Sequence, residues 1–285
     1  MMSRSPGSGL RAAEGLQAEP GAAPAQIEEL APPPRSHSNT WWVRLISIAV
    51  VLIGWEIIGR QINPLFMSYP SAIVRAGIRM ALDGELWSAT VSSLSTLLGG
   101  FAIASIIGIL LGLPIGRYRL VDAATDWLVN ALYATPLVAI VPLVVLWFGR
   151  GDEAKLFIVT IVAVFPVLIN TAAGVRNVPS TLIDVGTAFA ASERQVFTKI
   201  ILPAVLPYIM TGLRLGIGRA IIGMVVAEFF TAITGLGALI VKYGNQYDTA
   251  SMFVPILVLM LLGVALTSLV RRVEQIAAPW REHED

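Results

Sequence analysis

The chain has 285 residues, of which 55% are hydrophobic and only 14% are charged. Soluble domains carry about 25% charged residues, so this composition indicates a chain that resides in a membrane. The 20 Lys and Arg residues are balanced by 19 Asp and Glu residues, which excludes a strongly basic nucleic-acid binder.

Several kinds of site are excluded by the residue types that the chain lacks. It has no cysteine, which excludes disulfides, iron–sulfur clusters and thiolate sites. Its two histidines, His37 and His283, stand near the ends, so we expect no histidine-based metal or general-base site in the membrane. No lysine follows a glycine, as the phosphate-binding loop of ATPases requires. We therefore expect no cofactor in this chain, and ATP, if used, must be bound by another chain.

Residues 1–40 differ in composition from everything that follows. They hold six of the 17 prolines and contain no apolar run. Such a segment cannot bury enough surface to offset the entropy of ordering it, so we expect a disordered cytoplasmic tail. Residues 41–285 are then the transmembrane domain.

Six apolar segments are long enough to cross a bilayer core of about 30 Å as helices, which takes about 20 residues. Each is bounded by charged or turn-forming residues, and three of them contain proline. The sequence therefore predicts an all-α integral membrane protein with six transmembrane helices. The expected spans are Trp42–Gly59, Leu94–Gly116, Trp127–Gly149, Leu156–Val175, Tyr208–Thr231 and Met252–Val270.

The positive charges of the connecting segments predict the orientation of these spans. With the N-terminus inside, twelve Lys and Arg residues lie on the cytoplasmic side and six lie outside. Cytoplasmic loops carry the excess of positive charge in membrane proteins. Both termini are therefore expected in the cytoplasm.

The longest cytoplasmic connection, residues 176–207, has the pattern of two short helices between Pro179 and Lys199. An apolar stripe at helical spacing marks the first helix. Ala190, Ala191 and Ser192 form a break, after which Ser192 and Gln195 have the spacing of a capping box for the second helix. Pro203 and Pro207 are expected to end it. Such a pair of short helices can dock into a soluble partner protein, or it can be a connector that lies in the lipid interface.

Residues 184–203, DVGTAFAASERQVFTKIILP, resemble the "EAA" loop of binding-protein-dependent ABC importer permeases. That loop has an E-A-A triplet, a glycine four residues after it and a terminal I-x-L-P. Here Ile200 to Pro203 supply the end, Ala190 takes the glycine position, and Asp184 to Gly186 take the triplet. The spacing is therefore kept, while the triplet and the glycine are substituted.

Further short matches between residues 41 and 275 resemble one subfamily, the nitrate/sulfonate/taurine-type permeases. They include Asn63 to Phe66, Thr211 to Arg214, Ala227 with Glu228, and Gly235 to Gly237. One departure is Thr96, where many members carry arginine. The resemblance implies a permease of the type I importer fold that moves a small anion delivered by a periplasmic or lipid-anchored binding protein. It implies two ATPase subunits, which bind ATP and Mg, and a second copy of this chain.

The resemblance also implies that the loop of about 179–203 is the coupling helix that contacts the ATPase. Phe189 or Phe197 is then expected to be a buried anchor in the partner. The alternative is that both rings dip into lipid or pack beneath the loop. The residues implied in coupling are Asp184, Gly186, Phe189, Ala190, Ser192, Phe197 and Pro203.

Polar residues within the spans are candidates for a translocation path, because polar groups in a bilayer are costly. They can equally serve as hydrogen-bonding or ionic contacts between helices. Spacing along one helix excludes a direct pair between Arg214 or Arg219 and Glu228, so their partners must lie elsewhere. Arg214 is expected near the coupling loop. The path candidates are Asn130, Tyr133, Thr135, Asn170, Thr171, Arg219 and Glu228.

Two other functional classes remain as alternatives. A stand-alone secondary transporter usually shows internal repeats and coupling charges at the midplane, and neither is visible here. A membrane scaffold without transport is the second alternative. Neither would co-purify with an ATPase, as an importer permease does. The sequence leaves the solute open among sulfonates, taurine, nitrate, pyrimidine precursors of thiamine and aromatic acids.

Overall fold

The computed structural model describes residues 40–231 and 233–277, and every regular element in these ranges is helical. The tail expected at residues 1–40 lies outside the described residues except for Thr40, where α1 begins. The elements are α1 (Thr40–Gln61), α2 (Pro70–Leu82), α3 (Glu85–Arg117), α4 (Arg119–Ala134), the 3₁₀ helix η1 (Leu137–Ile140), α5 (Val141–Phe148), α6 (Asp152–Arg176), α7 (Ser180–Ala188), α8 (Glu193–Val196), the π-helix η2 (Phe197–Ile201), α9 (Leu202–Thr231), α10 (Leu236–Asn245) and α11 (Thr249–Ala277).

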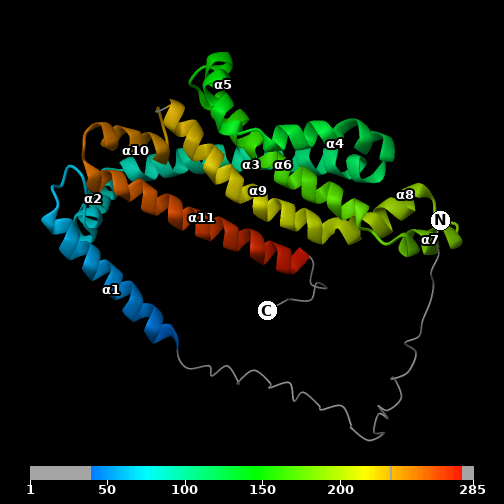
Figure 1. Ribbon diagram of the computed structural model, residues 1–285, viewed down its shortest axis with the longest axis horizontal. Helices are drawn as coiled ribbons and strands as arrows, with labels where there is room; N and C mark the ends of the chain where they lie inside the picture. Colours follow the sequence, from blue (N-terminus) through cyan, green and yellow to red (C-terminus); the bar gives the residue numbers. More distant parts are fainter. Residues whose placement is uncertain (1–39, 232, 278–285) are drawn as a thin grey trace, which may run out of the picture. The chain divides into compact units, whose positions relative to one another are not determined.

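The chain divides into two compact units, residues 1–47 and residues 48–285. The described part of the first unit is the start of α1, where the rings of Trp41 and Trp42 have centroids 3.7 Å apart. The second unit holds the remainder of α1 and every other element described (Figure 1).

Five stretches are long and apolar enough to cross a membrane: Trp41–Gln61, Glu85–Arg117, Asp152–Arg176, Glu193–Thr231 and Thr249–Ile276. The third expected span, Trp127–Gly149, is not one straight helix. It is divided between α4 and the η1–α5 segment, which are bent by 81° relative to each other. The break is at Thr135, whose extended backbone (ψ 135°) is the conformation that a following proline imposes.

The centre of the second unit is the packing of α3 against α6, with α9 packed against both (Figure 1). The facing residues of α3 and α6 advance in the same direction along the chain, so these helices are parallel. Small residues of α3 let the backbones approach closely, as the G-x-x-x-G spacing predicts. The pairs in which a Cβ added to the glycine would come closest are Gly100–Val159, Gly108–Val167, Gly112–Thr171 and Gly116–Ala172.

This parallel arrangement fixes the course of the broken segment. The chain leaves the end of α3 at Arg117 and must begin α6 at Asp152, which lies beside the opposite end of α3. The α4–η1–α5 segment therefore returns along the length of the bundle. This segment takes the place of the third expected span. With it the helical fold has up to six spans, and the expected all-helical fold is confirmed.

The prolines expected to end the second loop helix do not end it. Helical structure continues from Glu193 to Thr231 through both Pro203 and Pro207. Pro203 lies in the first turn of α9, where a missing N–H is tolerated. The preceding turn widens to a π-turn, in which the Leu202 N–H donates to Phe197 O.

Candidate functional site

A sharp turn ends α7 at the end of the bundle where α8 and the start of α9 also lie (Figure 1). Ala190 has φ +54°, a left-handed backbone that alanine rarely adopts. The Ala190 N–H donates to Thr187 O at 2.9 Å, and the Ala191 N–H donates to Gly186 O at 3.0 Å. These two bonds form a Schellman motif, in which glycine usually occupies the place of Ala190.

The next helix starts as the sequence predicts. Ser192 caps α8 by accepting a hydrogen bond from the Gln195 N–H, and the Gln195 side chain accepts one from the Ser192 N–H at 2.8 Å. Both bonds of the predicted capping box are therefore present. The Schellman turn and the box are consecutive, which leaves the chain little freedom between α7 and α8.

One face of this motif is packed against the bundle. Val196, Ile201 and Val205 are buried in a cluster that also includes residues of α3 and α6. Gly186 lies beneath Ile200, since a Cβ at position 186 would be 2.8 Å from Ile200 Cδ1. Phe197 is half-buried in the same cluster, which agrees with the alternative that its ring packs beneath the loop and leaves Phe189 as the candidate anchor. The Phe197 ring packs under the loop because helix α8 turns that side of the chain toward the bundle.

The opposite face of the motif is open and apolar. Leu182 and Val185 are exposed on α7, and Phe189 is 84% exposed at its end. Asp184, Ser192 and Pro203 are exposed as well. The predicted coupling residues thus fall into two groups. Gly186 and Phe197 hold the motif on the bundle, and Asp184 and Phe189 stand free.

The strain at Ala190 gives a direct prediction about the rigidity of this motif. Changing Ala190 to glycine removes a conformational cost of about 1 kcal/mol, so local opening should become about fivefold rarer. Trypsin cleavage at the exposed Arg194 and Lys199 measures that opening. Ala188→Gly is the control, because residue 188 is helical and glycine should speed cleavage there. Faster cleavage in Ala190→Gly would contradict the account.

The path candidates on α4 and α6 do not form one cluster. The Asn130 side chain donates to Asp126 Oδ2 at 2.9 Å, and the Thr135 hydroxyl donates to Ala131 O. Asn170 donates to Pro166 O at 2.8 Å within its own helix. The buried Thr171 faces Gly112, and its hydroxyl has no partner in the described part of the chain. Tyr133 lies beside Phe165, with ring centroids 6.3 Å apart.

The charged residues of α9 have three different environments. Arg214, which was expected near the coupling loop, is paired with Glu274 of α11. Arg219 is exposed near the middle of the helix. Glu228 is completely buried and bonded to Ser93 and to the backbone of Gly237.

Two residues that the sequence analysis did not single out lie near Glu228. Lys155 is only 1% exposed, and Ser93 is completely buried. Lys155 binds Asp152 three positions before it, a spacing that was visible in the sequence. Ser93 gave no signal, because its partners are more than 130 residues away. In the ranges 40–231 and 233–277 no cluster of His, Cys, Asp and Glu is suited to hold a metal ion.

These features define a multi-pass α-helical membrane protein with a rigid helical knob at one end of its bundle. The chain belongs to the family described as the binding-protein-dependent transport system inner membrane component, which matches residues 104–277. It is the permease subunit of an ABC importer and not the catalytic one. Such a system works with an ATPase and a binding protein, and no cofactor site is expected in the permease.

The relatives agree with the subfamily resemblance. The chain is 31% identical to a Bacillus subtilis permease assigned to aliphatic sulfonate transport, over 85% of this chain and 88% of that protein. It is 32% identical to the riboflavin permease RibX of Chloroflexus aurantiacus, over 89% and 97%. It is 30% identical to the taurine permease TauC of Escherichia coli, over 82% and 88%.

A solved structure confirms the fold. The chain is similar to the MetNI methionine ABC transporter in an inward-facing conformation, with a TM-score of 0.52 and 19% identity. The similarity covers 70% of this chain and 97% of that chain. The expected importer-permease fold is therefore confirmed.

Proposed function

We propose that two copies of this chain, with two cytoplasmic ATPases and one external binding protein, import a small anion by alternating access. The observation that carries the anion is Arg219, an exposed arginine near the middle of the membrane-spanning α9. The relatives named for sulfonates and taurine favour the same chemistry. The relative named for riboflavin makes an uncharged solute the competing choice.

Arg219 lies on a face of α9 that no other described helix covers. Leu215 and Ile222, one turn to either side, are each 52% exposed. We find no hydrogen bond or ion pair to Arg219 among the described residues. A guanidinium facing lipid at this depth costs about 3 kcal/mol or more, so the side chain needs water, a second copy or an anion. A solute path between two copies of the chain would give Arg219 water, a neighbouring copy and the transported anion.

The α7–α8 motif is the proposed contact with the ATPase. Its bundle face is rigidly packed, while Leu182, Val185 and Phe189 present an apolar face beyond the membrane spans. Motion of a bound ATPase would therefore pass directly to α6 and α9. This end then lies in the cytoplasm of a bacterial cell, with both termini on the same side and the chain in the inner membrane.

Uptake into proteoliposomes that contain the full complex tests the role of Arg219. Arg219→Gln should reduce uptake of the anionic solute about tenfold or more, because a charge-assisted contact is lost. Arg219→Lys, which keeps the charge, should retain more uptake than the glutamine variant. Arg271→Gln is the control, since Arg271 is an exposed charge near the end of α11. Unchanged uptake in Arg219→Gln would remove the anion path from α9.

Native mass of the solubilised complex tests the assembly. Two permeases, two ATPases and one binding protein are expected, in line with two-fold symmetry. One permease for each ATPase pair would contradict the homodimer. Uptake by the chain alone, driven by an ion gradient without an ATPase, would favour a secondary transporter. A chain that neither binds an ATPase nor transports would be a scaffold.

A further inference from the structure

The carboxyl group of Glu228 is bonded through both of its oxygens. Oε1 accepts a hydrogen bond from the Ser93 hydroxyl at 2.7 Å, and Oε2 accepts one from the Gly237 N–H at 2.7 Å. Glu228 is on α9, Ser93 on α3 and Gly237 on α10. A buried carboxyl group is costly unless both oxygens are satisfied. Glu228 therefore joins three helices at one point.

Ser93 extends this bonding to the start of α10. Its oxygen accepts a hydrogen bond from the Leu236 N–H at 2.8 Å while its hydroxyl donates to Glu228. Ser93, Leu236 and Glu228 are all completely buried. The three groups form a single chain of hydrogen bonds, and loss of any one leaves a buried polar group unsatisfied.

The backbone of residues 233–237, which leads from α9 into the first two residues of α10, is shaped around this carboxyl group. We call this segment the α9–α10 turn. Gly235 has φ +105°, and a Cβ at its position would lie only 2.0 Å from Glu228 Oε1. A Cβ at Gly237 would lie 2.7 Å from Glu228 Cβ. The two glycines let the turn close directly over the carboxyl group.

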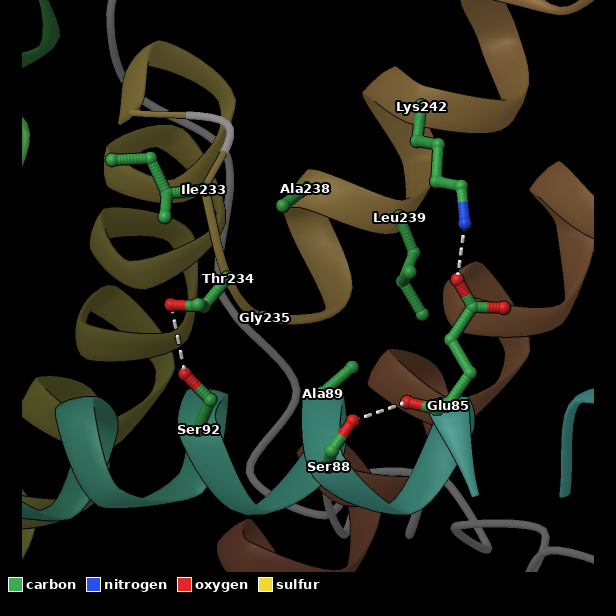
Figure 2. Close-up of a pocket in the computed structure, with 10 residues that line it drawn as sticks. All are labelled: Glu85, Ser88, Ala89, Ser92, Ile233, Thr234, Gly235, Ala238, Leu239 and Lys242. Atoms are coloured by element: carbon green, nitrogen blue, oxygen red, sulfur yellow. Dashed lines mark hydrogen bonds and ion pairs between the residues drawn. The ribbon is translucent and has the colours of Figure 1, made fainter. Parts of the chain in front are cut away.

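A second set of contacts holds the same turn from the side of α3 and α6. The Thr234 hydroxyl oxygen accepts hydrogen bonds from Lys155 Nζ at 2.6 Å and from Ser92 Oγ at 3.1 Å. Figure 2 shows the bond between Ser92 and Thr234 at the edge of a cavity. Lys155 also binds Asp152 at 2.9 Å. The turn is thus held by polar groups rather than by apolar packing alone.

The cavity adjoins the turn and includes Ser92 and Thr234 in its lining. It measures about 390 Å³ and is lined by residues of α3, of the turn and of α10 (Figure 2). Across it, Lys242 binds Glu85 at 2.5 Å, and Tyr243 donates to Glu85 at 2.6 Å. The hydrogen bond that Lys242 donates to the Glu85 carboxylate raises the pKa of Lys242, so the ammonium group stays charged at neutral pH. The turn therefore borders open space and is held by the polar contacts to Glu228, Ser92 and Lys155.

We propose that Glu228 is a positioning residue that latches the α9–α10 turn to α3, and that this latch releases and re-forms during the transport cycle. The proposal rests on the proposed import function. The cavity receives the turn when the bonds to Ser93 exchange, while Lys242 and Glu85 keep α10 attached to α3. Glu228 thereby sets how readily this end of the bundle changes state.

Labelling of a single cysteine measures the latch, because the natural chain has none. Ala238 is 8% exposed and lines the cavity, so Ala238→Cys is a small change at a suitable place. Its reaction rate with a membrane-impermeant maleimide is compared with and without ATP and vanadate in the full complex. The proposal expects a different rate in the two states. Equal rates would overturn it.

Variants of the latch separate a moving contact from a static one. Glu228→Gln and Ser93→Ala, in the Ala238→Cys background, should each shift the resting rate about tenfold toward the rate with ATP and vanadate. The double variant should shift the rate no further than Ser93→Ala alone, because that change already removes the Ser93–Glu228 bond. Ser95→Ala is the control, since Ser95 bonds only to its own helix at Ser92 O.

Two outcomes would overturn the latch without touching the proposed function. One is a resting rate unchanged by Glu228→Gln and Ser93→Ala. The other is a lower thermal stability in these variants with the difference between the two states kept. The resting rates can also be measured on the permease alone. A failure to bind an ATPase would then count against the proposed function, while the shift in resting rate would still support the latch.

Discussion

Changing Phe189 to alanine is expected to abolish most of the ATP hydrolysis that the binding protein stimulates. Its ring is 84% exposed at the tip of a rigid turn, which suits an anchor in a partner's pocket. Truncating such an anchor costs about 2 kcal/mol or more, so binding of the ATPase should weaken at least about 30-fold. Stimulated hydrolysis in the reconstituted complex and co-purification of the ATPase measure the effect.

Phe197→Ala is the matched control for this prediction. Its ring is half-buried under the loop, so this variant should lower the thermal stability of the permease first. Phe189→Ala should leave membrane insertion and thermal stability unchanged. Ala190→Glu, which adds a charge beside the open face, should impair coupling as Phe189→Ala does. Wild-type hydrolysis in both loop variants would remove the coupling role of this face.

Changing Gly112 to alanine is expected to destabilise the permease strongly. The added Cβ would lie 2.7 Å from Thr171 Cβ and 2.8 Å from Leu168 O, so α3 and α6 must move apart. Overpacking of this kind costs about 3 kcal/mol, and the contact with a backbone oxygen cannot be relieved by a side-chain rotation. The thermal unfolding midpoint of the detergent-solubilised chain should fall by several degrees.

Gly218→Ala in the membrane-spanning helix α9 is the control variant, for which no loss of stability is expected. A Cβ at Gly218 meets no atom within 4 Å, so the change should be neutral or stabilising by up to about 1 kcal/mol. Equal unfolding midpoints for the two variants would show that the close packing of α3 on α6 does not support the fold.

The apolar runs predicted the position of the spans, but they did not predict which proline would break one. Pro166, Pro207 and Pro255 lie inside continuous helices, whereas the chain breaks at Pro136. The difference between these prolines arises from the tertiary packing of their helices. α6 and α9 are packed against neighbours that hold them straight, while α4 has no buried residue. A proline is tolerated where neighbours support the helix.

The coupling motif shows the same limit at the level of single residues. The capping box could be predicted because Ser192 and Gln195 are three positions apart and bind each other. The different exposure of Phe189 and Phe197 could not, because it depends on packing against residues of α3 and α6. Glu228 is similar. Helix geometry excluded partners on α9, but the partners on α3 and α10 are defined only by the fold.

Protection of a cysteine at position 189 tests the central claim most directly, since the natural chain contains none. In the Phe189→Cys variant, which keeps a side chain of intermediate size, a water-soluble maleimide should react rapidly with the permease alone. Addition of saturating ATPase should slow the reaction at least about tenfold, while a cysteine at Leu82, which is 82% exposed at the end of α2, should react at the same rate throughout. Equal reaction at position 189 with and without a bound ATPase would contradict the assignment of this loop as the coupling element.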